Sequence, residues 1–181
     1  QMPITVRAEI LPTATFDGLT IRKSSIESRD FNLAYDGYLS ASSEGQLSGE
    51  GQIEVDEFSL RKWLRAGDWP VPHTQNLERL SRLSINTGIK LSSEMMSLRP
   101  FSLMLDETSI DGRIDLSLRP LNVDLELLAD KLNLDSYLSS NPSAQTGSST
   151  MPFPLVTGTY KLDVGELTVS KHLLNQVGFD L

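Results

Sequence analysis

Apolar and polar residues alternate with a period of two along most of this chain. Because successive side chains of a β-strand point to opposite faces, this alternation predicts strands with one apolar and one polar face. The clearest runs lie at residues 4–10, 31–35, 52–56, 85–91, 121–127 and 160–164. Strands of this kind are typical of antiparallel sheets with one solvated face. We therefore predict a mainly β fold, either a curved antiparallel sheet or a flattened β-sandwich or groove, with two or three short helices.

Three short segments depart from the alternation and favour helices instead. Residues 59–67 begin with Ser59 as a possible N-cap, have apolar residues at helical spacing and end at a glycine. Residues 74–83 begin with Thr74 as a second possible cap and place leucines on one side. Residues 134–138 are long enough for a single helical turn. We expect these helices to pack at the edges or ends of the sheet.

One stretch of low complexity suggests how the chain is organised. Residues 139–152 are rich in Ser, Thr, Pro and Gly and nearly lack large apolar groups, so we expect a flexible linker there. The linker would separate a β-rich segment at residues 1–138 from residues 153–181, which we expect to be closing strands of the same sheet system. The sequence has no run of 18 or more apolar residues and no signal peptide. We therefore expect a segment of a longer protein whose targeting segment lies outside this chain.

Two stretches of the sequence resemble each other. Residues 54–64 and 128–138 align without a gap, and each is a strand-like run followed by a short turn that closes on an aromatic residue and Leu. A sheet that grows by repeated strand units would produce such an echo. Chance similarity between leucine-rich strands explains it equally well.

The stretch LDETSIDGRIDLSL holds four carboxylates, Asp106, Glu107, Asp111 and Asp115. Three interpretations are a paired-carboxylate active site, a calcium loop and the solvated side of a hairpin. Acid–base catalysis needs carboxylates in a cleft that separates their pKa values, and a calcium loop of the EF-hand type needs ligands at regular alternate positions. Period-two spacing instead places Asp111 and Asp115 on one face with Arg113 between them. We therefore predict a hairpin whose acids are solvated.

Little else in the sequence favours catalysis or a bound cofactor. A net charge of −8 lacks the broad basic surface that phosphate backbones need, so we expect no nucleic acid partner. The sequence has no cysteine, no glycine-rich phosphate loop and no G-x-S-x-G motif. His73 and His172 lie in unrelated contexts. We predict that the chain is not an enzyme and has no catalytic residues, no cofactor and no metal ion.

The first predicted helix and the turn after it hold both tryptophans and a small basic run. Trp63 and Trp69 flank a Gly–Asp turn, and residues 61–65 read RKWLR. The tryptophans can stack on a sugar, and the basic run can contact acidic lipid headgroups. A core anchor for Trp63 and a solvated helix face for the basic run are the simpler alternatives.

An ordered set of motifs across most of the chain resembles the AsmA family of bacterial envelope proteins. The first three are FSLRKWL, WPVP and LERLSRLSINTGIKLS, and the next two are LMLDETSIDGRIDLSL and LELLADKLNLDSYL. The linker then lies where the family commonly has a spacer, and GTYKLDVGELTVSKHLLNQVGFDL resembles the family's closing strands. The first 45 or so residues match only in general character.

This resemblance implies a periplasmic segment of a protein that an N-terminal helix, outside this chain, anchors in the inner membrane. Family members are similar to bridge-like lipid transfer proteins, in which a curved sheet forms a groove with an apolar inside. The implied function is support of outer-membrane assembly and of phospholipid transfer between the inner and outer membranes. No catalytic residues come with the family, and other envelope proteins are possible partners.

The alternation identifies the side chains that would line such a groove. They are the apolar residues of the strands on either side of the carboxylate stretch, namely Leu103, Leu105, Ile110, Ile114, Leu116, Leu118, Val123, Leu125 and Leu127. Phospholipid acyl chains are the ligand that we expect on this face. The same residues would also serve as an ordinary core.

Two other functions remain open at this point. A scaffold for partner proteins in envelope biogenesis would have a fully packed core and a conspicuous exposed patch or strand edge. A carbohydrate-binding β-sandwich would place Trp69 and Asp68 in a shallow surface cleft.

Overall fold

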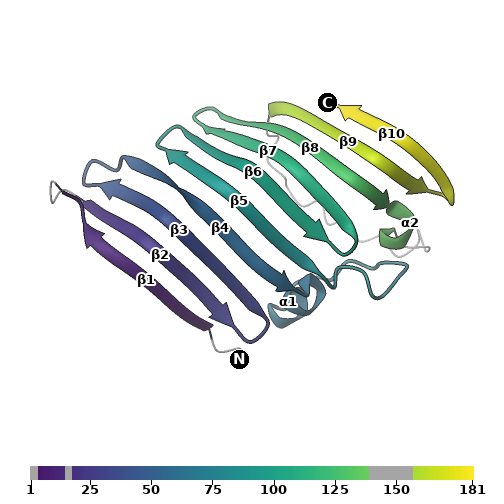
Figure 1. Cartoon of the computed structure of the whole chain (residues 1–181), viewed down its shortest axis with the longest axis horizontal. Coiled ribbons are helices and arrows are strands. Elements are labelled where there is room, and N and C mark those ends of the chain that lie inside the picture. Colours follow the sequence, from purple (N-terminus) through teal and green to yellow (C-terminus); the bar gives the residue numbers. More distant parts are fainter. Residues whose placement is uncertain (1–3, 15–17, 139–156) are drawn as a thin grey trace.

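The computed structural model describes residues 4–14, 18–138 and 157–181, and most of them belong to one sheet (Figure 1). The ten strands are β1 (Ile4–Pro12), β2 (Gly18–Ser28), β3 (Phe31–Ser42), β4 (Leu47–Phe58), β5 (Leu83–Ser92), β6 (Met95–Leu105), β7 (Thr108–Leu118), β8 (Leu121–Asn133), β9 (Thr157–Val169) and β10 (His172–Asp180). Their order in the sheet is their order in the chain. The sheet is curved and not closed, which confirms the predicted fold class in its single-sheet form.

Neighbouring strands are antiparallel, as the alternation predicted, with one exception. β8 and β9 are parallel, pairing from Asn122 with Thr157 to Asn133 with Thr168. Parallel neighbours require the chain to return to the starting end of the sheet between them. That return, with the linker predicted at residues 139–152, lies outside the described residues.

Two of the three predicted helices are present. α1 (Leu60–Ala66) begins where the Ser59 side chain accepts a hydrogen bond from the Lys62 N–H at 3.3 Å, and it ends at Gly67. α2 (Leu134–Tyr137) is the single turn expected there, capped by the Asn133 side chain.

The helix predicted at residues 74–83 is wrong. This segment forms turns, and its Leu77 is 77% exposed, so the leucine spacing does not mark a buried helix face. The Thr74 hydroxyl accepts a hydrogen bond from Arg61 and donates one to the Asn76 carbonyl, which fixes a turn in place of a helix cap. Leu80 has a φ of +62°, in the left-handed region that an α-helix does not use.

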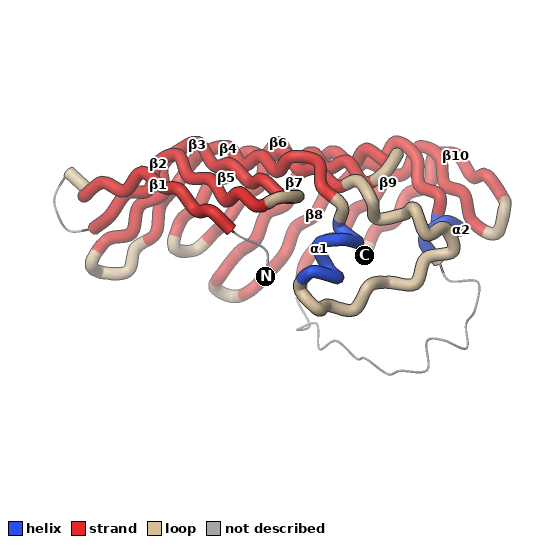
Figure 2. The backbone as a smooth tube through the Cα atoms, turned by 90° about the horizontal axis from the view of Figure 1, so that it is seen from below, coloured by secondary structure: helices blue, strands red, loops and turns tan. Residues whose placement is uncertain are grey.

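The two ends of the strands differ. At one end, here called the helical end, lie α1, α2 and the connection at residues 67–82, and Figure 2 shows them on one side of the sheet. At the other end, here called the open end, short turns at residues 43–46, 93–94 and 119–120 join the strands. The chain runs from the helical end at β1 to the open end after β10 (Figure 1).

The buried core lies toward the helical end. Among the described residues the buried apolar side chains are Val55, Phe58, Leu80, Ala129, Val164 and Leu167. Ala129, Val164 and Leu167 form one cluster, against which Leu134 of α2 packs. At α1, the Trp63 ring lies 6.3 Å from the rings of Phe31 and Phe58. The helices therefore cover the sheet at this end.

Candidate binding surface

One face of the sheet is apolar along its whole width, and we call it the apolar face. Residues that pair across neighbouring strands project to the same side, so the strand register defines rows that cross the sheet. One row crosses all ten strands and is aliphatic throughout: Val6, Ile26, Leu33, Val55, Ile85, Leu103, Ile110, Ala129, Val164 and Val177.

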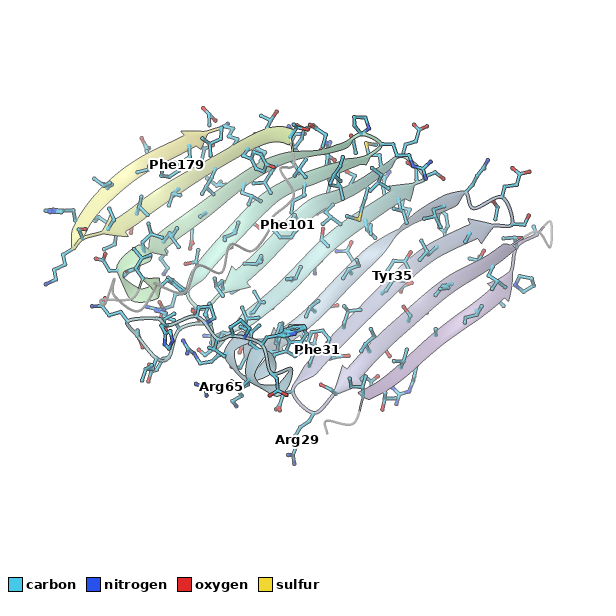
Figure 3. The ribbon with its side chains drawn as sticks, turned by 180° about the vertical axis from the view of Figure 1, so that it is seen from behind. Arg29, Phe31, Tyr35, Arg65, Phe101 and Phe179 are labelled. Atoms are coloured by element: carbon cyan, nitrogen blue, oxygen red, sulfur yellow. The ribbon has the colours of Figure 1, made fainter. Side chains whose placement is uncertain are left out.

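Three further rows lie on the same face, toward the open end. They are two residues apart along β3, β4, β5, β7, β8 and β9, and the spacing is irregular at the bulges of β1, β2 and β6. The nearest contains Ala8, Ser24, Tyr35, Ile53, Thr87, Phe101, Gly112, Leu127, Leu162 and Phe179, and Figure 3 labels Tyr35, Phe101 and Phe179 at three points across the sheet. The next contains Gly37, Gly51, Ile89, Leu98, Ile114, Leu125 and Tyr160. The last contains Ile10, Ile21, Leu39, Gly49, Leu91, Met96, Leu116, Val123 and Gly158. None of the four rows contains a charged side chain.

The nine residues predicted from the sequence all lie on the apolar face. Seven of them belong to the four rows, and the other two continue the face at its ends. Leu105 pairs with Leu83 at the helical end, and Leu118 pairs with Leu121 at the open end. The structure therefore places these residues on one continuous surface.

The opposite face is polar and carries ladders of charge. Asp111 accepts a hydrogen bond from the Ser102 hydroxyl at 2.7 Å, and Asp115 is bonded by Arg99 and by Ser97. Arg113 donates to Glu126 at 2.7 Å on the neighbouring strand. The arginines hold the pKa of both Asp115 and Glu126 below its usual range. Asp111, Arg113 and Asp115 thus lie on the polar face, as predicted.

Asp106 corrects the prediction that all four acids of the hairpin are solvated. It is buried, and its carboxylate accepts backbone N–H groups from Leu80 at 2.9 Å, Ser81 at 3.0 Å and Arg82 at 3.2 Å. It also accepts the Tyr137 hydroxyl at 2.8 Å. These bonds tie the β6–β7 turn to residues 67–82 and to α2. A residue's partners distant in the sequence cannot be found from its local alternation, which is why the sequence missed this one.

These hydrogen bonds also determine the ionisation states of Asp106 and Tyr137. Burial by itself would raise the pKa of Asp106, but the four donated hydrogen bonds outweigh it and hold the pKa below its usual value. Burial, together with the bond to Asp106, raises the pKa of the Tyr137 hydroxyl. The pair is therefore a carboxylate bonded to a neutral phenol, held in place by backbone groups.

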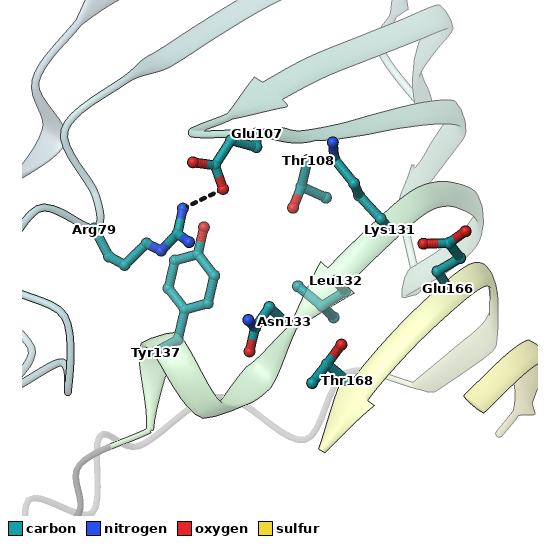
Figure 4. Close-up of a pocket in the computed structure, with 9 residues that line it drawn as sticks. All are labelled: Arg79, Glu107, Thr108, Lys131, Leu132, Asn133, Tyr137, Glu166 and Thr168. Carbon is teal, nitrogen blue, oxygen red and sulfur yellow. Dashed lines mark hydrogen bonds and ion pairs between the residues drawn. The ribbon is translucent and has the colours of Figure 1, made fainter. Parts of the chain in front are cut away.

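A polar pocket of about 240 Å³ lies beside this cluster at the helical end (Figure 4). Arg79 bonds Glu107 at its rim at 2.6 Å, and the Arg79 guanidinium lies 5.7 Å from the centre of the Tyr137 ring. Lys131 and Glu166 of neighbouring strands line the other side. Arg79 and Glu107 form an ion pair at the rim, of the kind that is common on protein surfaces.

The apolar face is hollowed between β2 and β5. The hollow has a volume of about 250 Å³ and is lined by Ile21, Ser24, Leu33, Tyr35, Leu39, Gly49, Ile53, Ile89 and Leu91. Glycines account for it, because Gly37, Gly49 and Gly51 place no side chains on the face. A Cβ on Gly51 would lie 2.6 Å from the Tyr35 ring, so the glycine leaves the room in which that ring lies.

The sequence predicted the strands at residues 31–35, 52–56 and 85–91 that border this hollow, but it predicted neither β2 nor the hollow itself. The paired glycines at positions 49 and 51, on the same side of one strand, were the available signal. Tyr35 lies against them, and its hydroxyl donates to the Glu50 carbonyl at 3.3 Å. Burial raises the pKa of Tyr35, so the one hydroxyl of the lining that could ionise stays neutral.

The remaining candidate residues are dispersed. His73 lies in the connection at residues 67–82 and His172 begins β10. Within the described parts of the chain, no group of three or more His, Cys, Asp or Glu side chains could hold a metal ion. No helix in those parts is long and apolar enough to cross a membrane. Trp69 lies edge-on to Trp63, with ring centres 4.7 Å apart.

No protein-family model, curated protein or solved structure matches this chain. The resemblance to the AsmA family therefore stays a prediction that rests on the quoted motifs.

Proposed function

We propose that the apolar face binds phospholipid acyl chains, and that this chain is a periplasmic segment of an AsmA-like, inner-membrane-anchored protein. Its role would be non-enzymatic, in phospholipid transfer between the inner and outer membranes and in outer-membrane assembly. The observation that supports this most directly is the set of four uncharged rows that cross one sheet. Toward the open end of that sheet, no second layer of described residues covers them.

The chemistry of the face favours an acyl chain over a polar ligand. The strands satisfy one another's backbone groups, so the face offers a ligand few polar partners, chiefly the hydroxyls of Ser24, Tyr35, Thr87 and Tyr160. Burial of a methylene is worth roughly 0.8 kcal/mol, so about ten methylenes would contribute on the order of 8 kcal/mol before ordering costs. An acyl chain needs no directional contact to obtain that free energy.

The shape of the face agrees with a chain-like ligand. The uncharged rows run across the strands. Two of them are continuous from β1 to β10, and the other two extend from β3 to β9 and from β1 to β9. A chain lying along them would pass over the hollow between β2 and β5, where the glycines leave room for it. The open end provides access, because the described connections there, at residues 43–46, 93–94 and 119–120, are short turns.

Photo-crosslinking from the full-length protein in cells tests the proposal. A photoreactive residue at Leu116 or Leu125 should form lipid adducts, because both positions lie on the apolar face. Ser117 is a matched control, since it is next in the chain to Leu116 but projects from the polar face. The absence of lipid adducts at both apolar positions would contradict the proposal that this segment binds acyl chains.

A protein-binding scaffold is the second candidate, and one observation favours it. β1 and β10 are the two edges of the sheet, and each pairs with a neighbour on one side only among the described strands. β1 is exposed along its whole length. Such edges can add a strand from another chain. In the crosslinking experiment, protein adducts in place of lipid adducts at Leu116 and Leu125 would favour this candidate.

A further inference from the structure

α1 and the turn after it form a small exposed surface at the helical end, here called the α1 surface. It consists of Lys62, Trp63, Arg65 and Trp69, all of them exposed. The backbone N–H of Trp69 donates to the Leu64 carbonyl at 2.9 Å, which holds the turn against the helix. The four side chains therefore belong to one rigid corner of the fold.

The charge of the α1 surface is opposite to that of the whole chain. Residues 60–72 contain three cations and a single anion, Asp68, whereas the chain as a whole has a net charge of −8. Arg61 is directed inward and donates to the Arg79 carbonyl and the Thr74 hydroxyl. Lys62 and Arg65 form no ion pair with any other described residue, and Glu57, the acid before α1, pairs with Arg82. Two cations are thus available to an external anion.

The aromatic part of the α1 surface is equally accessible. Trp69 is 51% exposed and Trp63 is 37% exposed. A tryptophan beside unpaired cations is the composition found where proteins contact the headgroup region of a bilayer, because the indole ring has an apolar body and a polar N–H. Each cation near an anionic bilayer contributes about 1 kcal/mol of attraction.

The position of the α1 surface links it to the apolar face. The Trp63 ring lies against Phe31 and Phe58, which end that face beside α1. Figure 3 shows Arg65 and a further exposed cation, Arg29 of the β2–β3 turn, at the same margin of the molecule. A flat anionic partner that meets Lys62 and Arg65 would therefore meet the end of the apolar face as well.

We propose that the α1 surface docks on the anionic phospholipid headgroups of a bilayer, with Lys62 and Arg65 as the headgroup contacts and Trp69 inserted at the interface. The docking brings the helical end of the apolar face to the membrane. It goes beyond the proposed function, since docking requires no acyl chain on the apolar face.

Tryptophan emission measures this docking directly, because the only two tryptophans of the chain lie in the α1 surface. The 181-residue chain is mixed with vesicles of phosphatidylcholine alone, or with vesicles containing 30% phosphatidylglycerol. The expected result is a blue shift and co-sedimentation with the anionic vesicles only, both weakened by added salt. Equal binding to the two vesicle types, or binding to neither, overturns the proposal.

Charge variants locate the contact. Lys62→Gln and Arg65→Gln should each weaken binding to the anionic vesicles about fivefold, and the double variant about 30-fold. Arg119→Gln is the matched control, since Arg119 is an exposed cation in a turn at the open end. It should leave binding unchanged. A loss with Arg119→Gln equal to that with Arg65→Gln overturns the assignment to the α1 surface.

The docking proposal and the acyl-chain proposal can be tested independently of each other. A Leu116→Glu variant, altered on the apolar face, should lose lipid adducts but bind the vesicles like the unmodified chain. The double variant Lys62→Gln/Arg65→Gln should lose vesicle binding but still bind a fluorescent phospholipid supplied as monomers. If Leu116→Glu abolishes vesicle binding, the docking proposal is overturned, because the contact would then involve the apolar face.

Discussion

The helical end and the open end of the apolar face contain the same kinds of side chain but differ in what lies against them. At the helical end, Val164 is 2% exposed and Leu167 is 4% exposed, beneath the region of α2. At the open end, Leu121 is 44% exposed and Leu47 is 41% exposed, although their strands pair just as fully.

The comparison separates two sources of stability that are usually combined. Strand pairing extends over the whole sheet and satisfies the backbone, whereas apolar burial depends on a second layer. Among the described residues, the second layer consists of α1, α2 and residues 67–82. We infer that the helical end stabilises the fold, and that the open end keeps apolar surface available for a ligand.

The largest expected effect is the loss of a side chain from the covered end. Leu167→Ala should lower the free energy of unfolding by about 3 kcal/mol, because it leaves a cavity in the Ala129–Val164–Leu167 cluster. Leu121→Ala is the matched substitution at the open end and should cost less than about 1 kcal/mol. Urea denaturation of both variants measures the difference. Equal losses would mean that the two ends are equally packed in solution.

The second-largest effect concerns the hydrogen bonds of Asp106, which hold residues 67–82 and α2 against the sheet. Asp106→Ala should lower the free energy of unfolding by about 2 kcal/mol, because the N–H groups of Leu80, Ser81 and Arg82 lose their acceptor. Asp111→Ala, on the solvated side of the same hairpin, should cost less than about 0.5 kcal/mol. Urea denaturation measures both variants. Equal losses in the free energy of unfolding would show that the Asp106 carboxylate does not hold residues 67–82 against the sheet.

The third effect is the pH dependence of the stabilisation that the Asp106 carboxylate provides. The pKa of Asp106 is lower in the folded chain than in the unfolded one, so the unfolded state binds the proton first as the pH falls. The stabilisation is therefore complete above the ordinary aspartate pKa of about 4 and is lost as the pH falls through the folded-state value.

Urea denaturation between pH 7 and pH 2 tests this sign. The gap in stability between the unmodified chain and Asp106→Asn should be largest at neutral pH and should narrow below about pH 4. A gap that widens with acid would contradict the depressed pKa.

The smallest effect on stability is expected at the open end, where the effect on binding should be largest. Leu116→Glu should change the free energy of unfolding by less than about 1 kcal/mol, because no second layer of described residues covers Leu116. It should nevertheless remove lipid adducts from a photoreactive residue at Leu125. Ser117→Glu, on the polar face, is the control and should leave the adducts intact. Strong destabilisation by Leu116→Glu would show that the open end is a packed core.

Much of the sheet could be predicted from local pattern. The side of the sheet to which Ile110, Ile114 and Leu116 project depends only on the period of two, and the structure places them as the alternation required. The same holds for Asp111 and Arg113 on the opposite side. The cap at Ser59 was equally local, because the Ser59 side chain and the Lys62 N–H that donates to it lie three residues apart.

The failures share a different origin. Thr74 looked like a helix cap, but its hydroxyl accepts a hydrogen bond from Arg61, which lies 13 residues earlier in the chain. Asp106 looked solvated, but its donors lie 24 to 26 residues away along the chain. The hollow at Tyr35 required three glycines on two strands to meet. In each case the deciding partner is distant in the sequence.

The sequence by itself determined which side of each strand is apolar, because that follows from backbone geometry within a few residues. Only the tertiary structure decided that ten strands form one sheet, that β8 and β9 run parallel, and that the cover lies at one end. Those outcomes depend on contacts between distant residues, whose free energies the local pattern does not contain. The open end of the apolar face, which no described residue covers and on which the proposed function rests, is therefore a property of the fold and not of any single strand.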